Sequence, residues 1–204
     1  MDIQSLNLIK VNYNINPTKI LDIGANNGYF SDLCKSVWPN SNITAIEANP
    51  FWSSTLKEKN YNHIITLLGN ETKSSVNFYV NKQDKGSTGC SIYKELSNFF
   101  DENNCETISL PMNKLDDITN DSFDFIKMDT QGSELDIIKG GLNTIKKCKH
   151  LLIEVSLKPS NENAPLKEDI VKFLANNNFE IVDVLYDHII NGELFQQDIL
   201  FKNI

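Results

Sequence analysis

The sequence predicts an α/β fold with a mostly parallel β-sheet, helices on both faces and an antiparallel hairpin at the carboxyl end. Short apolar runs alternate with helix-length segments over about residues 19–175, and strands buried in parallel sheets have this near-continuous apolar pattern. The last two apolar runs are separated by only a short polar segment at 187–192. A connection of this length cannot form a crossover, so it joins antiparallel strands.

Five apolar runs are predicted as parallel strands, and two late runs complete a seven-stranded sheet. The strands are Lys19–Ile23, Ile43–Ile46, Ile64–Leu68, Phe123–Met128 and Leu151–Val155, followed by Phe179–Leu185 and Leu194–Phe201. Helices are predicted after four of the parallel strands. They are Gly28–Val37, Phe51 to about Lys59, about Ser133 to Lys146, and about Leu166 to Ala175.

An insertion is predicted at 71–121, between the third and fourth strands. Val76–Val80 and Thr107–Leu110 have the pattern of strands, and a polar loop of small residues lies at Gly86–Ser91. We expect this insertion to form a wall of a ligand pocket. With residues 1–18 as an amino-terminal extension, the 204 residues are expected to form one domain, since domains commonly run about 100–200 residues.

The amino-acid composition limits the kinds of molecule that we expect the chain to bind. The chain carries 27 acidic and 19 basic residues, for a net charge of −8, and every basic residue is lysine. An acidic chain without arginine is poorly suited to nucleic acid, because binding requires clustered positive charge and arginine supplies the planar fork that grips phosphate. We therefore expect a small or neutral partner and no nucleic acid.

The location of the protein is predicted from three further features. The amino terminus lacks a basic and apolar targeting pattern. No apolar run approaches the roughly 18 residues of a membrane span. The four cysteines form no C-x-x-C pair, so we expect free thiols, as in a reducing compartment. Together these features favour a cytoplasmic protein.

A glycine turn at residues 21–28 is the strongest local signal for a ligand site. A strand runs into Gly24 and a helix opens at Gly28, which is where an open α/β sheet binds ligands. Asp22, near the end of the strand, could accept from a ligand ammonium. A nicotinamide-binding turn would read G-x-G-x-x-G, whereas Asn26 occupies the second glycine position. A cofactor without phosphate therefore fits better, although an empty turn remains an alternative.

Two further residues follow neighbouring strands. Glu47 ends the second strand about twenty residues after the glycine turn, where a carboxylate accepts hydrogen bonds from ribose hydroxyls. This position supports any adenosine cofactor, and an exposed acid without a ligand is the alternative. Asn70 follows the third strand and is placed to bond an adenine edge, unless it belongs to a simple turn.

Two acids end the fourth and fifth strands. Asp129 and Glu154 are expected at one sheet edge, where they could act as a general base or bind a divalent cation such as Mg²⁺ through oxygen. Glu134 either contributes to the site or simply stabilises a helix amino terminus.

Histidine is the usual alternative base. His63 and His150 precede strands and are expected at the opposite sheet edge. His188, in the late hairpin, remains a candidate.

Five segments of the sequence together resemble the FkbM family of S-adenosylmethionine-dependent methyltransferases, over residues 19–201. The resemblance is carried by LDIGANNGYFS, AIEANP, FIKMDTQGSELDIIKGG, LLIEV and QQDILF. It implies the Rossmann-like class I methyltransferase fold and S-adenosylmethionine as cofactor. It also implies O-methylation of a small-molecule or glycan acceptor, most often at a sugar hydroxyl of a glycan or glycosylated natural product.

The resemblance also assigns residues to roles. Cofactor contacts are expected from Asp22, Gly24, Asn26, Gly28, Glu47 and Asn70, with Asp129 near the methionine end. Acceptor contacts are expected from Ser87, Thr88, Ser91, Gln131 and Glu134. Asp129 and Glu154 are the candidate catalytic pair and the candidate metal ligands. The chain is short for the family before Lys19, so a partner subunit of a homodimer could complete the acceptor pocket.

Two other function classes stay open from the residues themselves. A nicotinamide-dependent oxidoreductase would share Glu47, but it should have the third glycine and a catalytic Tyr–Lys or His arrangement. A binding module that keeps the fold without turnover would be expected to lose the acids of the crevice, all of which are present.

Overall fold

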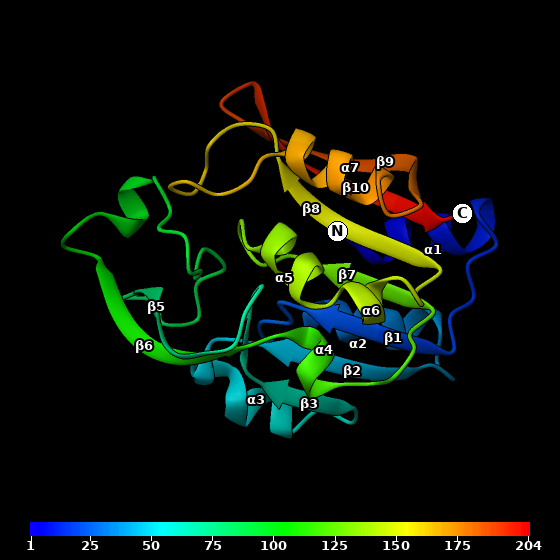
Figure 1. Ribbon diagram of the computed structural model, residues 1–204, viewed down its shortest axis with the longest axis horizontal. Coiled ribbons are helices and arrows are strands. Elements are labelled where there is room, and N and C mark those ends of the chain that lie inside the picture. Colours follow the sequence, from blue (N-terminus) through cyan, green and yellow to red (C-terminus); the bar gives the residue numbers. More distant parts are fainter.

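A seven-stranded sheet, with helices on both faces, forms the centre of the molecule in a computed structural model that describes residues 1–204 (Figure 1). Its strand order is β3-β2-β1-β7-β8-β10-β9. The strands are β1 (Lys19–Ile23), β2 (Asn42–Glu47), β3 (Asn62–Ile65), β7 (Phe125–Met128), β8 (His150–Ser156), β9 (Phe179–Ile190) and β10 (Glu193–Asn203). Only β10 runs against its two neighbours. The predicted fold class is therefore confirmed.

Two apolar clusters, one on each face, hold the helices to this sheet. The helices are α1 (Ile3–Asn12), α2 (Tyr29–Val37), α3 (Ser53–Lys57), α4 (Leu115–Ile118), α5 (Glu134–Gly140), α6 (Leu142–Ile145) and α7 (Lys167–Ala175). Because side chains alternate along a strand, Ile20 of β1 packs with α1 and α2. Leu21, the next residue, packs in the cluster that α5, α6 and α7 share. Helices thus cover both faces, as predicted.

The predicted insertion at 71–121 supplies two strands of a second, three-stranded sheet of order β4-β6-β5. This sheet consists of β4 (Leu67–Leu68), β5 (Lys73–Asn81) and β6 (Cys105–Asn113), with a short 3₁₀ turn at Asn98–Phe100. A small apolar cluster beneath it contains Leu67, Phe78, Val80 and Met112. Both predicted strands are present and longer than expected.

The third predicted strand is divided between the two sheets. Residues 62–65 pair with β2, whereas Leu67 and Leu68 pair with β6. Between them, the Thr66 N–H donates to the Glu47 carbonyl at 2.8 Å. Thr66 is β-branched and suits a strand, so the run from Ile64 to Leu68 shows no break at this change of sheet.

Two predicted helices are shorter than expected, and two helices, α1 and α4, were not predicted. The helix after β7 is interrupted at Gly141, a residue of low helix propensity. The helix expected from Phe51 begins with a 3₁₀ turn at Pro50–Trp52 and ends at Lys57. The amino-terminal extension contains α1, whose buried Leu6 and Ile9 pack against the sheet.

Candidate functional site

Two neighbouring cavities open at the carboxyl ends of the central strands, where the sheet order reverses between β1 and β7. Ligands bind at this position in open α/β sheets. The first, here called the Glu47 cavity, measures about 640 Å³. The second, here called the Glu154 cavity, measures about 930 Å³. Residues that line both are Gly24, Asn26, Thr88 and Asp129.

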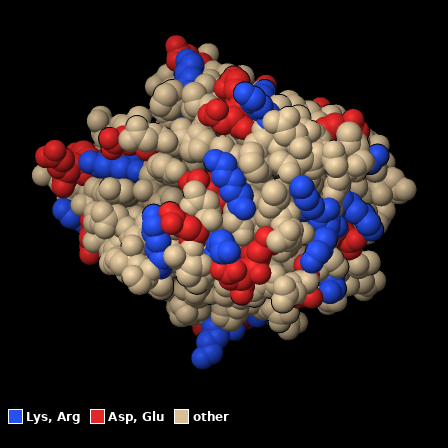
Figure 2. Space-filling view, viewed as in Figure 1, with Lys and Arg blue, Asp and Glu red and all other residues tan.

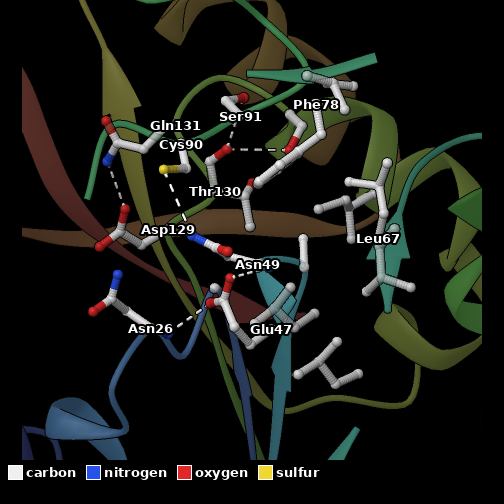
Figure 3. A pocket seen from close by; sticks show the side chains of 18 of the residues that line it. Asn26, Glu47, Asn49, Leu67, Phe78, Cys90, Ser91, Asp129, Thr130 and Gln131 are labelled. Carbon is white, nitrogen blue, oxygen red and sulfur yellow. Dashed lines mark hydrogen bonds between the residues drawn. The ribbon is translucent and has the colours of Figure 1, made fainter. Parts of the chain in front are cut away.

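The Glu47 cavity has an apolar half and a polar half (Figure 3). The apolar half comes from both sheets and from α5, and it contains Ile46, Ala48, Leu67, Leu68, Phe78 and Ile137. The polar half contains Asn26, Glu47, Asn49, Asp129, Thr130 and Gln131. A flat, largely apolar ring with a polar attachment fits this division.

Glu47 is held rigidly at the floor of its cavity. Its two carboxylate oxygens accept from the backbone N–H groups of Asn26 and Asn49, each at 2.6 Å. Burial raises the pKa of Glu47, and these two hydrogen bonds oppose the shift without cancelling it. The carboxylate is thus oriented before any ligand arrives.

The polar loop of the insertion closes over the Glu47 cavity. Asn26 Nδ2 donates to the Gly86 carbonyl at 3.3 Å, and Asn49 Nδ2 donates to the Lys85 carbonyl at 2.7 Å. Ser91 Oγ donates to the Thr130 carbonyl at 3.3 Å. These bonds fasten the loop to the edge of the main sheet.

Fastening the loop places all three predicted loop residues, Ser87, Thr88 and Ser91, around the Glu47 cavity. Only Thr88 of these also lines the Glu154 cavity. The loop therefore covers the expected cofactor side more than the expected acceptor side.

Asp129 stands between the two cavities and is held by two partners. Its carboxylate lies 3.5 Å from Lys127 Nζ and accepts from Gln131 Nε2 at 2.8 Å. Burial raises the pKa of Asp129, but the charge of Lys127 and these bonds outweigh burial, so the pKa lies below its ordinary value.

Glu154 lies across the Glu154 cavity from the glycine turn, and Gln131 joins it to Asp129. The same Gln131 Nε2 donates to Glu154 Oε1 at 2.8 Å, and Gln196 Nε2 donates to that oxygen at 3.0 Å. Burial, followed by the charges of Asp129 and Asp198, raises the pKa of Glu154 well above its ordinary range. The predicted carboxylate pair is thus brought together.

Two residues of the glycine turn were predicted as cofactor contacts but do not line either cavity. The Asp22 carboxylate is buried on the α2 side of β1, where it accepts from Ser31 Oγ at 2.7 Å and lies 3.5 Å from Lys127 Nζ. Gly28 adopts a left-handed φ of 83° at the start of α2 and packs against the Tyr61 hydroxyl. Both residues therefore support the conformation of the glycine turn without lining either cavity.

Asn70 and Glu134 also lie outside the two cavities. Asn70 is exposed, and its Nδ2 donates to Asp136 at 3.3 Å. The Glu134 carboxylate is buried and accepts from the backbone N–H groups of Thr130 at 2.7 Å and Gly132 at 3.0 Å. In this structure the Glu134 carboxylate closes the loop after β7 and lines neither cavity.

Lys127, His188 and Asp198 line the Glu154 cavity, and the sequence identifies only His188 among them as a candidate. Lys127 lies within the segment FIKMDTQGSELDIIKGG, which assigns it no role. His188 was an open candidate, and Asp198 lies in the closing strand without a flanking turn. Alternation along β10 could have drawn attention to Asp198, because it shares a strand face with the buried Leu200.

One face of the molecule shows how the charged side chains are distributed. On the face shown in Figure 2, lysines and acids are interspersed, without a continuous basic area. None of the helices has the length and apolar character needed to span a membrane. The four cysteines are free thiols.

Comparisons with known proteins show the family to which the chain belongs. The model of the methyltransferase FkbM domain matches residues 22–181. A solved FkbM methyltransferase from Methylobacillus flagellatus KT is similar at 19% identity and a TM-score of 0.59, over 91% of this chain and 43% of that chain. This chain thus spans less than half the length of that protein. No curated protein matches the chain.

Other solved structures share the fold. An S-adenosylmethionine-dependent methyltransferase from Clostridium acetobutylicum is 11% identical, with a TM-score of 0.57 over 98% of this chain and 90% of that chain. Magnesium protoporphyrin IX methyltransferase from Synechocystis, solved with bound SAM, is 10% identical, with a TM-score of 0.53 over 99% and 78%. The fold is that of class I S-adenosylmethionine-dependent methyltransferases, and the chain belongs to the methyltransferase FkbM domain family.

Proposed function

We propose that the chain is an S-adenosylmethionine-dependent O-methyltransferase whose acceptor is a sugar hydroxyl of a glycan or glycosylated natural product. The observation that carries this proposal is the position of Asp129, which lines both cavities. A group transferred from a ligand in one cavity to a ligand in the other would pass beside its carboxylate.

The Glu47 cavity suits S-adenosylmethionine. Its apolar half can take the adenine ring, and the fixed Glu47 carboxylate lies where ribose hydroxyls could donate to it. Asp129, at the opposite end, can face the positive ammonium or sulfonium. No lysine lines this cavity, which fits a cationic ligand better than the pyrophosphate of a nicotinamide cofactor.

The Glu154 cavity suits a hydroxylated acceptor. Its wall combines aromatic side chains, Tyr29 and Phe30, with polar groups that can bond hydroxyls, including Asn27, Thr88, Glu154 and His188. The family resemblance favours a sugar among such acceptors.

When bound, the cofactor supplies an electrophilic methyl group. The residues of this chain then have two tasks, alignment of the acceptor oxygen and removal of its proton. Alignment can contribute several kcal/mol to the barrier reduction. Asp129 or Glu154 takes the proton as the carbon–oxygen bond forms and the carbon–sulfur bond breaks, an effect worth about 10²–10⁴-fold.

The test of the cofactor is isothermal titration with S-adenosylhomocysteine, with NAD as a control ligand. We expect micromolar affinity for the former alone. Glu47→Gln should weaken it about tenfold, which corresponds to about 1.4 kcal/mol. Glu71→Gln is the matched control, because Glu71 is exposed and lines neither cavity. Comparable NAD affinity, or no binding by folded protein, would overturn the proposal.

The test of the reaction uses S-adenosylmethionine with a panel of sugar acceptors, with mass spectrometry to detect one added methyl group. Glu154→Gln should reduce turnover at least tenfold while S-adenosylhomocysteine affinity stays within about threefold. Asp129→Asn should reduce turnover by a similar factor and also weaken S-adenosylhomocysteine, because Asp129 faces the ammonium of the ligand. Unchanged turnover in both variants would exclude the carboxylate pair as the base.

A further inference from the structure

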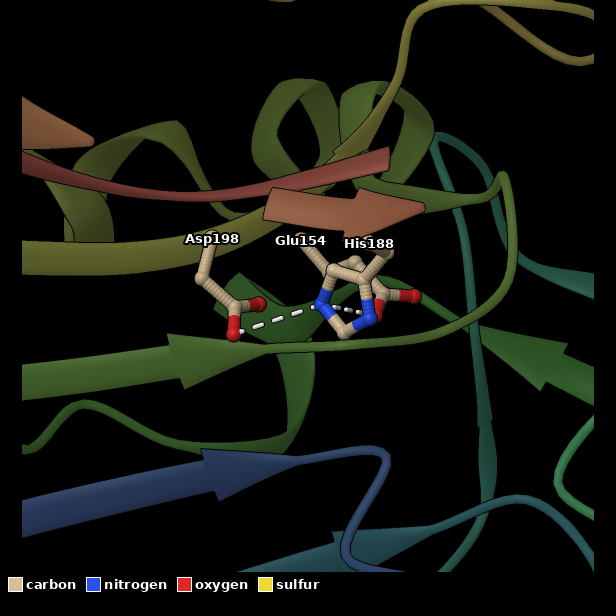
Figure 4. Close-up of side chains that lie close together, drawn as sticks. All are labelled: Glu154, His188 and Asp198. Atoms are coloured by element: carbon tan, nitrogen blue, oxygen red, sulfur yellow. Dashed lines mark ion pairs between the residues drawn. The ribbon is translucent and has the colours of Figure 1, made fainter. Parts of the chain in front are cut away.

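Three neighbouring strands bring one imidazole and two carboxylates to the same place at the end of the sheet (Figure 4). Asp198 of β10 lies directly opposite Glu154 of β8. His188 of β9 lies opposite Gln196, two residues from Asp198 and therefore on the same face. All three side chains line the Glu154 cavity.

His188 faces both carboxylates at ion-pair distance but forms a hydrogen bond with neither. His188 Nε2 faces Glu154 Oε2 at 3.3 Å and Asp198 Oδ2 at 3.4 Å. This nitrogen is buried and has no hydrogen-bond partner. A single N–H could not point at both oxygens, and buried polar atoms without partners are rare. A group between the three side chains would explain the arrangement.

Glu154 adds an independent indication. Its side chain is only 10% exposed, and its Oε1 accepts both glutamine amides. Its Oε2 receives no hydrogen bond and points toward the histidine. The glutamines therefore fix the carboxylate while one oxygen stays available, which is how outer partners orient metal ligands.

We propose that Glu154, His188 and Asp198 bind a divalent first-row transition metal ion. Ligand atoms about 2.0–2.2 Å from a tetrahedral metal lie about 3.4 Å apart, and the three ligand atoms here all lie within 4.8 Å of one another. One imidazole nitrogen with two carboxylate oxygens favours Mn²⁺, Fe²⁺ or Zn²⁺ over purely oxygen-bound cations.

Local charge supports a cation at this place. The carboxylates of Glu154 and Asp198 have no lysine partner. Lys127, which lines the same cavity, lies 3.5 Å from each of Asp22 and Asp129. A divalent ion would balance the two acids. Asp129, expected from the sequence as a metal candidate, is not a member of this cluster.

The site has the form of a catalytic rather than a structural metal centre. It offers three protein ligands and faces a cavity, so further coordination positions are open to a second molecule. If the chain acts as proposed above, on which this step rests, the ion would hold an acceptor oxygen and favour loss of its proton.

The experiment is an electron paramagnetic resonance titration of chelator-treated full-length protein with Mn²⁺. We expect one bound ion per chain with micromolar affinity. His188→Ala and Asp198→Asn should each weaken binding at least tenfold. Asp187→Asn is the matched control, because Asp187 neighbours His188 but accepts from Gln197 instead. It should bind Mn²⁺ as the native chain does.

Electron spin-echo envelope modulation of Mn²⁺ bound to the native chain is a second measurement. It does not depend on whether any variant folds. It should show one coordinated nitrogen, and Zn²⁺ should displace the signal. No binding, binding without nitrogen, or binding unaffected by the folded variants would overturn the proposal. In that case Glu154, His188 and Asp198 would be a cluster of titratable side chains that binds no metal.

S-adenosylhomocysteine titration of the same samples separates the two proposals. Cofactor binding without metal binding removes only the metal site. Metal binding without cofactor binding removes the proposed function and leaves the site.

Discussion

A methyl group added to Gly24 would lie 1.8 Å from the backbone carbonyl oxygen of Asp129. The glycine turn after β1 and the end of β7 therefore touch through their backbones, and Gly24 also has a left-handed φ of 78°. This contact fixes the shared wall of the two cavities.

Gly24→Ala should destabilise the protein by about 3 kcal/mol or more, because a left-handed alanine and a steric clash add together. Gly192→Ala is the matched control, since Gly192 has a φ of 80° with no atom within 4 Å of the added carbon. It should cost about 1 kcal/mol. Urea unfolding of both variants measures the difference, and equal losses would mean that the contact adds no strain.

Asp124 should make stability depend on acidity. Its carboxylate accepts from Thr18 N–H at 2.9 Å and Lys19 N–H at 3.1 Å, and Lys149 Nζ lies 2.9 Å away. Burial raises the pKa of Asp124, but these partners outweigh burial and hold the pKa below its ordinary value. The stabilisation is therefore present above pH about 4 and is lost as pH falls through the lowered pKa.

Asp124→Asn should lower the free energy of unfolding by about 1–2 kcal/mol at pH 7. The difference from the native chain should shrink at acidic pH. Asp121→Asn, which alters an exposed acid 3.5 Å from Lys19, should change little at either pH. Urea unfolding at both pH values tests this, and a constant difference would contradict the assignment.

Asn70→Ala should leave S-adenosylhomocysteine affinity within about twofold of the native value, measured by isothermal titration. The side chain is exposed and bonded to Asp136, so it does not reach the Glu47 cavity. A tenfold loss would show that Asn70 turns inward when the ligand binds, as the sequence suggested.

Glu134→Gln should cost about 2 kcal/mol of stability, because an amide cannot replace a carboxylate that accepts two buried backbone N–H groups. Glu168→Gln is the matched control, because Glu168 also lies in the first turn of a helix but is exposed. That change should cost at most about 1 kcal/mol, the size of a helix-dipole effect. Equal losses by thermal unfolding would reduce Glu134 to a dipole role.

Local patterns predicted the strands and the fold class. The run before Gly24 and the run ending at Glu47 read as strands because their residues are apolar and bounded by turn residues. The short segment between the last two apolar runs predicted that they form a hairpin. These features depend on neighbouring residues, so a single sequence displays them.

Features that depend on distant pairing were not predictable. The chain changes sheets at Thr66, a β-branched residue that reads as part of one strand. Asp22 turns to the α2 face because of its place in the pleat of β1. Asp198 reaches Glu154 only through the register of β10 against β8. The sequence around Glu134 does not distinguish a carboxylate that binds a ligand from one that binds its own loop. The conformation of residues 130–133 determines which of the two forms.

The division of the third strand at Thr66 should affect how long a ligand stays in the Glu47 cavity. One wall of the Glu47 cavity belongs to the large sheet and the other to the small sheet, and the two sheets are continuous through this residue. Hydrogen bonds from the Thr66 N–H to Glu47 and from Asn113 to the Thr66 hydroxyl hold the junction. We expect the walls to separate when the insertion swings about this point. Residence time in the cavity should therefore reflect the rate of that opening rather than the strength of any one contact.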